Sequence, residues 1–333
     1  MNHTIASLFH INPRFLRSTH LERDFTTPDS CRGYILTDFT KSCLERLADG
    51  LVAGSTKRAW RLTGDYGTGK SSFALVLAHL FSGHHGALEN LQKVVLNPDL
   101  SEAVDIDGGG KENLNIIPIL VTGNRLPLRI ALFRALRKYL AAAYTNDSKT
   151  LSPRLQHIVK IGDDIPSIDD EEIVEALVQF SKVVKSDSKG SGVLLILDEL
   201  GKFLEFAAMY PERQDIYLLQ QLAEAASRSG DTPLFVLGLL HQGVSAYTDH
   251  LDGASKGEWE KVAGRFEEIP FNQPLEQVVV LLSSALGVRS EDVPIKHRKE
   301  ATAQMEFAIE QGYYGPVPLR SQSRDSFDGL LYT

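Results

Sequence analysis

Apolar residues along the chain follow two alternating patterns. Runs rich in β-forming residues predict buried strands over Ala59–Thr63, Ile116–Thr122, Gly192–Leu197 and Pro233–Leu240, with a short extended piece at Glu268–Phe271. Between these runs, apolar residues recur at helical spacing. Helices are expected over Asp38–Val52, Ser72–Phe81, Pro127–Tyr144, Asp170–Val184, Asp215–Ser227, Leu275–Leu286 and Arg298–Gln311. Strands that alternate with helices indicate an α/β fold with a mainly parallel sheet covered on both faces.

The same patterning divides the chain into three parts. Residues 1–30 lack a clear period and are predicted to form an irregular N-terminal arm. Residues 31–272 hold the strand–helix alternation and form the predicted core. Residues 273–333 are expected to form a small helical lid or the start of a further domain, followed by a polar tail without periodicity.

Composition narrows the class of protein. The 333 residues are 43% hydrophobic with a net charge of −8, which is ordinary for a globular chain and argues against a charge-driven, histone-like DNA binder. The longest apolar runs are far shorter than the ~20 residues that span a bilayer, so no membrane association is expected. Two cysteines, Cys31 and Cys43, are too few for a disulfide scaffold and favour a reducing cytoplasm.

A glycine-rich turn follows the first predicted core strand. Its residues fit the pattern G-x-x-x-x-G-K-[ST] and open a helix, which is the context that a phosphate-binding loop requires. We expect Lys70 to contact the β- and γ-phosphates of ATP and Ser71 to ligate Mg²⁺. The nucleotide-binding residues predicted here are Gly64, Asp65, Tyr66, Gly67, Thr68, Gly69, Lys70, Ser71 and Ser72.

Two acids end the strongly apolar strand Gly192–Leu197. Asp198 is the expected second contributor to Mg²⁺ binding, and Glu199 is the expected base that activates the attacking water. Lys70 and Asp198 are separated by 128 residues, which leaves room for extra strand–helix units. This spacing favours ATPases with an additional central strand over small G proteins.

Three later residues are candidates for the same chemistry. His241 and Gln242 end the next apolar strand, where a polar side chain can sense the γ-phosphate and position water; the alternative is a hydrogen-bonded pair at a strand end. Arg265 follows 23 or 24 residues later and is placed to act as an arginine finger on a neighbouring subunit. The alternative for Arg265 is a surface ion pair with Glu267 or Glu268.

Taken together, these stretches resemble the AAA+ ATPases, in the branch near origin-recognition and Cdc6-like proteins. Leu197–Glu205, Leu219–Glu224 and Gly264–Phe271 further resemble the large ATP-binding proteins of bacterial phage-defence systems of the BREX type. The resemblance implies a three-layer P-loop core with a helical lid, an adenine contact near Tyr34–Thr37, and assembly into a homo-oligomer or a complex of defence proteins. Larger relatives continue for hundreds of residues, so a truncated or short form that keeps the ATPase part is expected.

Three functions are weighed. The first is Mg-ATP hydrolysis coupled to assembly or remodelling on DNA or a partner protein, and the second is a nucleotide-gated switch or scaffold with little turnover. A small-molecule kinase is disfavoured by the Asp198–Glu199 pair and by Arg265. DNA contact follows mainly from the resemblance. The basic candidates for it, which also fit a solvated helix face, are the N-terminal segment and Arg125, Arg129, Arg134, Arg137 and Lys138.

Overall fold

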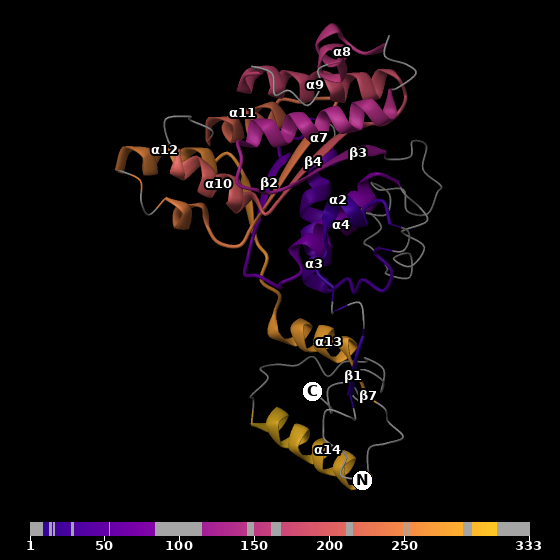
Figure 1. Ribbon diagram of the computed structural model, residues 1–333. Coiled ribbons are helices and arrows are strands. Elements are labelled where there is room, and N and C mark those ends of the chain that lie inside the picture. The colour runs from indigo at the N-terminus through magenta and orange to yellow at the C-terminus, as the bar shows by residue number, and fades with distance from the viewer. Residues whose placement is uncertain are drawn as a thin grey trace. The chain divides into compact units, whose positions relative to one another are not determined.

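The chain is described by a computed structural model (Figure 1). The structure describes residues 9–12, 15, 17–27, 30–52, 54–83, 115–144, 150–160, 168–210, 216–248, 251, 253–288 and 295–311. Contacts within the chain define two compact units. The larger, here called the sheet unit, comprises His20–Tyr34 and Lys41–Asn272, and the smaller comprises Met1–Thr19, Ile35–Thr40 and Gln273–Thr333. The three parts proposed from the sequence stay a prediction, and the polar tail lies outside the described residues.

A five-stranded parallel sheet organises the sheet unit. Its strands are β2 (Ala59–Thr63), β3 (Ile116–Thr122), β4 (Gly192–Asp198), β5 (Leu234–Leu240) and β6 (Glu267–Pro270). Their order is β3-β4-β5-β2-β6, so β5 lies between the strand before the glycine-rich turn and the strand that ends in the acids. The predicted α/β class and the additional central strand are confirmed.

Helices cover both faces of this sheet (Figure 1). The helices α7, α9 and α11 pack on one face, and α2 and α4 pack on the other. Among the described residues, the helices of the sheet unit are α2 (Leu21–Asp24), the main part of α3 (Asp38–Ala48), α4 (Lys70–Phe81), α7 (Leu128–Ala143), α8 (Pro153–Lys160), α9 (Asp170–Ser186), α10 (Leu200–Met209), α11 (Ile216–Ser227) and α12 (Gly253–Ala263). The result is three layers with the sheet in the middle.

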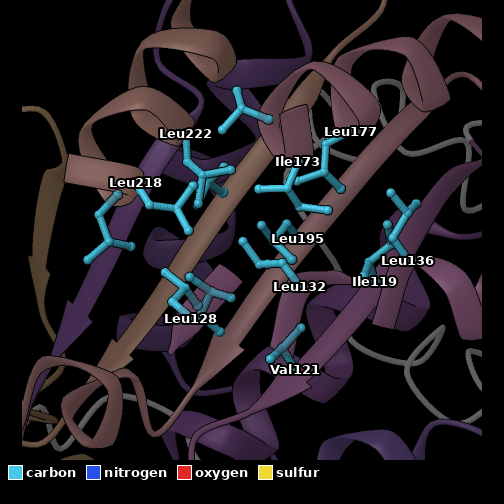
Figure 2. Close-up of a cluster of buried hydrophobic side chains, with 14 of the residues drawn as sticks. Ile119, Val121, Leu128, Leu132, Leu136, Ile173, Leu177, Leu195, Leu218 and Leu222 are labelled. Atoms are coloured by element: carbon cyan, nitrogen blue, oxygen red, sulfur yellow. The ribbon is translucent and has the colours of Figure 1, made fainter. Parts of the chain in front are cut away.

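The strands β4 and β5 are apolar along almost their whole length, because helices cover both faces of the sheet. All seven residues of β4 and all seven of β5 are buried, as expected for strands that are covered on both faces. Figure 2 shows leucines and isoleucines of α7, α9 and α11, Leu132 among them, packed over β3 and over Leu195 of β4. This packing holds the carboxyl ends of β4 and β5 in place.

Local signals also set the start of α9. Asp169 accepts a hydrogen bond from the Glu172 N–H at 2.8 Å, and Glu172 accepts one from the Asp169 N–H at 3.1 Å. This capping box satisfies two N–H groups that the helix itself leaves unpaired. The predicted helix and its acidic first turn are confirmed, and the helix continues to Ser186.

The described residues of the smaller unit form two helices besides the start of α3, and a two-stranded antiparallel sheet. The helices are α13 (Leu275–Ala285) and α14 (Ile295–Glu310), and the strands are β1 (Phe9–Ile11) and β7 (Leu286–Val288). The short strand β1 differs from the irregular arm that the sequence predicts. A three-residue strand carries too little periodicity to be seen, and it exists because β7 supplies its hydrogen-bond partners.

Both cysteines are buried and neither forms a disulfide. Burial raises the pKa of Cys43 to about 11, so its thiol is protonated at neutral pH. Among the described residues, no helix combines the length and the apolar character needed to cross a membrane. The described residues also contain no cluster of three or more His, Cys, Asp or Glu side chains suited to hold a metal ion.

Candidate nucleotide site

The glycine-rich turn joins the carboxyl end of β2 to the first residue of α4. Gly67 and Gly69 have φ angles of +80° and +91°, a backbone conformation that only glycine adopts at low cost. Gly69 caps α4, so the loop leads directly into a helix N-terminus. This arrangement directs backbone N–H groups and the positive end of the helix dipole toward one place, as an anion site requires.

Lys70 is buried inside this loop. Its ammonium donates to the carbonyl oxygens of Gly64 and of Asp65 (2.6 Å) and lies 3.4 Å from the Thr68 hydroxyl. Burial lowers the pKa of Lys70, although the negative charges of Asp198 and Asp65 act in the opposite direction. The Lys70 ammonium therefore places a positive charge inside the loop, and a polyphosphate is the anion that matches it.

Ser71 and Asp198 are brought together from distant parts of the chain. The Ser71 hydroxyl donates to Asp198 Oδ1 at 3.1 Å, across 127 positions of sequence. Burial raises the pKa of Asp198, while the hydrogen bonds from Ser71 and from the Glu199 N–H (2.9 Å) oppose that shift. A hydroxyl and a carboxylate in contact are hard oxygen ligands, so this pair fits Mg²⁺.

Glu199 is the residue at which β4 turns into α10. Its φ and ψ of 50° and 41° lie in the left-handed region, which is costly for a residue other than glycine. Its carboxylate makes no capping bond to α10 and instead forms an ion pair with Lys202. The strained turn sets the position from which this side chain extends. Lys202 is a partner that the sequence pattern did not indicate.

Gly123 supports the two acids from the neighbouring strand. It follows β3 directly, and its N–H donates to the Asp198 carbonyl oxygen at 2.8 Å. A Cβ atom at position 123 would lie 2.1 Å from the Glu199 carbonyl oxygen, so only glycine fits this approach. Sequence reasoning missed Gly123, although a glycine placed directly after a strand at the carboxyl edge of a sheet is a usable signal.

The two polar residues at the end of β5, His241 and Gln242, lie next to different tyrosines. The His241 ring stacks on the ring of Tyr66, with 3.4 Å between the centroids, and neither His241 nitrogen has a hydrogen-bond partner in the part of the chain that the structure describes. Burial and the charge of Lys70 lower the pKa of His241, which favours the neutral imidazole. The Gln242 side chain instead lies near Tyr247 and acts to lower the pKa of its hydroxyl.

Tyr247 connects the end of β5 to the first turn of α10. It is buried, with its pKa raised to about 12 by burial, and Gln242 and the His241 backbone act to lower that pKa. A Cβ atom at position 201 would lie 2.2 Å from the Tyr247 hydroxyl. Gly201 therefore allows this contact, which ties the turn carrying Glu199 to the strand carrying His241.

Arg265 forms an ion pair, but with a partner that the sequence did not indicate. Its guanidinium lies 3.5 Å from the carboxylate of Glu224 on α11. Of the two predicted alternatives, Glu268 is bound at 2.8 Å by Arg61. The arginine side chain is 53% exposed, so this pair leaves much of it open to solvent.

The strand register places Arg265 far from this chain's own phosphate loop. Glu267 pairs with Trp60, so Arg265 lies level with the amino end of β2, whereas Gly64 lies beyond its carboxyl end. Six residues of extended chain correspond to about 20 Å. A single arginine side chain does not cover that distance, so any action of Arg265 on a nucleotide must be on that of another subunit.

The remaining candidates lie around the sheet. Arg125 follows β3 at the carboxyl edge of the sheet. Arg134 on α7 is exposed. Three other basic residues of this segment have acidic partners: Arg125 with Glu205 (4.0 Å), Arg129 with Asp170 (3.3 Å) and Lys138 with Glu22 (3.9 Å).

Comparisons with known proteins give a distant likeness of fold. No family model matches the sequence, and no curated protein matches it. One similar solved structure is the ADP form of the Aeropyrum pernix ORC2 protein, with 13% identity over 97% of this chain and 73% of that chain and a TM-score of 0.46. Another is the same protein in ADPNP–ADP complexes, with 14% identity over 95% of this chain and 70% of that chain and a TM-score of 0.47.

Proposed function

We propose that the chain binds and hydrolyses Mg-ATP as a P-loop ATPase of the AAA+ type. The observation that carries this proposal is the contact of Ser71 with Asp198 beside the buried Lys70. A helix N-terminus, a buried ammonium and a hydroxyl–carboxylate pair at one edge of a parallel sheet match the parts that hold a nucleoside triphosphate and its metal ion. Ser71 and Asp198 would hold Mg²⁺, which when bound would neutralise negative charge on the phosphates.

Residues of the chain itself bind the phosphates, accept the proton of the attacking water and sense the γ-phosphate. Lys70 and the loop N–H groups bind and orient the phosphates, and Glu199 accepts a proton from the attacking water. Of the two predicted sensors, His241 is favoured over Gln242, since both of its nitrogens are buried and lack a hydrogen-bond partner among the described residues.

Turnover is proposed to require a second copy or a related subunit. Arg265 is partly exposed and lies at the edge of the sheet opposite its own phosphate loop, which suits a group that acts on a neighbour's ATP. An arginine finger of this kind raises the rate by roughly 10³–10⁵. The chain is thus proposed to work as an oligomer in the cytoplasm.

We further propose that ATP hydrolysis is coupled to action on DNA or on a partner protein in bacterial phage defence. It rests on the resemblance of Leu197–Glu205, Leu219–Glu224 and Gly264–Phe271 to BREX-type ATPases. DNA contact draws little support from α7, because acidic side chains pair with Arg129 and Lys138.

A nucleotide-gated switch with slow turnover is the second candidate function. The ion pair of Glu199 with Lys202 favours it, because the ammonium restrains the carboxylate that has to reach the attacking water. ATP binding without turnover at any protein concentration would be its signature.

The test compares nucleotide binding and turnover in the full chain. Binding of a fluorescent ATP analogue and Mg-ATP turnover are measured against protein concentration for wild type, Glu199→Gln and Arg265→Ala, with and without double-stranded DNA. Turnover that rises steeply with concentration and falls in both variants supports the ATPase. DNA stimulation supports the defence role, and failure to bind ATP overturns the proposal.

A further inference from the structure

Lys202 holds the candidate base of the site by two contacts. Its ammonium forms an ion pair with the Glu199 carboxylate, and its backbone N–H donates to the Glu199 carbonyl oxygen at 3.0 Å. The two residues are three positions apart, at the start of α10. The restraint is therefore built into one helical turn and needs no other part of the chain.

The direction of the Glu199 side chain is the informative feature. A carboxylate next to a helix N-terminus ordinarily accepts hydrogen bonds from the free N–H groups of the first turn. Glu199 makes no such bond, and its oxygen is bound by Lys202 instead. The lysine, more than the helix end, decides where this carboxylate points.

The pair also lies within the electrostatic surroundings of the site. The pKa of Lys202 is raised, first by the hydrogen bond to Glu199, and the negative charge of Asp198 contributes in the same direction. Glu199 and Lys202 in turn act in opposite senses on His241. The ammonium is thus placed among the groups expected to surround the phosphates.

We infer that Lys202 is a positioning residue that restrains Glu199 and slows the reaction of the isolated chain. A general base must offer an oxygen to a proton of the attacking water. While Lys202 binds one carboxylate oxygen of Glu199, it fixes the direction of the side chain, so turning the carboxylate toward the attacking water requires the pair to part. This inference rests on the proposed ATPase function, because it assigns a control to the base of that reaction.

The first experiment measures the ion pair without any turnover. The full chain is pulsed with acetic anhydride, and acetylation of individual lysines is followed by mass spectrometry in wild type and in Glu199→Gln. Lys202 should react several-fold faster in Glu199→Gln. Lys261 is the internal control, because it forms the same i,i+3 pair with Glu258 on α12 and should react equally in both proteins. Equal labelling of Lys202 in both proteins would overturn the inference.

The second experiment measures the restraint in Mg-ATP turnover. Lys202→Met should raise kcat about two- to fivefold with KM unchanged, which corresponds to about 0.4–1 kcal/mol, the range of a partly exposed ion pair. Lys202→Arg keeps a cation and should give a smaller rise. Adding Glu199→Gln to Lys202→Met should remove the gain, and Lys261→Met, the matched control, should leave turnover unchanged.

The outcomes separate this inference from the proposed function. A lower kcat in Lys202→Met, or unchanged turnover beside normal ATP binding, would overturn the restraint and leave the ATPase standing. A rise in KM for ATP would also overturn it, since Lys202 would then be a nucleotide contact. Wild-type protein that binds no nucleotide would overturn the proposed function and the inference together.

Discussion

Replacing Gly123 by alanine tests whether β3 sets the position of the two acids. The added Cβ atom would lie 2.1 Å from the Glu199 carbonyl oxygen and 3.1 Å from that of Asp198. Contacts below 3.0 Å are not tolerated, so the Glu199 carbonyl must move by about 0.9 Å. Both neighbours are backbone atoms and cannot simply rotate away. The displacement therefore reaches the acidic turn itself.

The size of the effect follows from this movement. Misplacing a catalytic group by about 1 Å costs on the order of 10²-fold in rate, and overpacking of this kind costs about 1–3 kcal/mol of stability. We expect Gly123→Ala to lose about 10²-fold in Mg-ATP turnover and several degrees in Tm, while α4 keeps its phosphate loop and ATP binding persists.

The assay pairs turnover with thermal unfolding and uses a matched glycine. Gly243 follows β5 at the same edge of the sheet, and a Cβ atom there would be 3.6 Å from its nearest neighbour, the Ser245 hydroxyl. Gly243→Ala should therefore behave as wild type. Wild-type turnover and Tm in Gly123→Ala would refute the reasoning that this close approach positions Glu199.

Three further predictions concern charge, assembly and the core. Burial raises the pKa of Asp198, so the folded chain loses stability as the pH rises from the usual aspartate range through that raised pKa. Without nucleotide, Asp198→Asn should therefore match or exceed wild type in Tm at pH 7, by a margin that shrinks toward low pH. A lower Tm of the variant at pH 7 would contradict this. Arg265→Ala should lose roughly 10³-fold or more in concentration-dependent turnover, with little change in Tm because it breaks one exposed ion pair. Arg228→Ala is the control, because Arg228 faces the same Glu224 at 3.9 Å. An equal loss of turnover in both variants would argue against an arginine finger at position 265. Leu132→Ala, at a fully buried position of α7, should cost about 2–5 kcal/mol in denaturant unfolding, and a cost below about 1 kcal/mol would show that α7 is not part of the core.

The sequence alone determined those features whose signals are local. The loop Gly64–Ser71, the strand ending at Asp198 and the helices α4, α7, α9 and α11 follow from spacing, periodicity and glycine placement, which act over a few residues. The separation of Lys70 and Asp198 leaves room for the strand–helix unit of β3 and α7, whereas the additional central strand, β5, comes after Asp198 and is predicted by its own apolar run, Pro233–Leu240.

The tertiary structure alone decided the contacts between distant segments. Gly123 meets the Glu199 carbonyl because β3 pairs with β4, and Arg265 pairs with Glu224 because α12 and α11 pack together, while Glu268, closer in sequence, is taken by Arg61 on the neighbouring strand. The pairing of β1 with β7 joins segments from opposite ends of the chain. Such contacts depend on strand order and helix packing, and a single sequence carries no local pattern that specifies them.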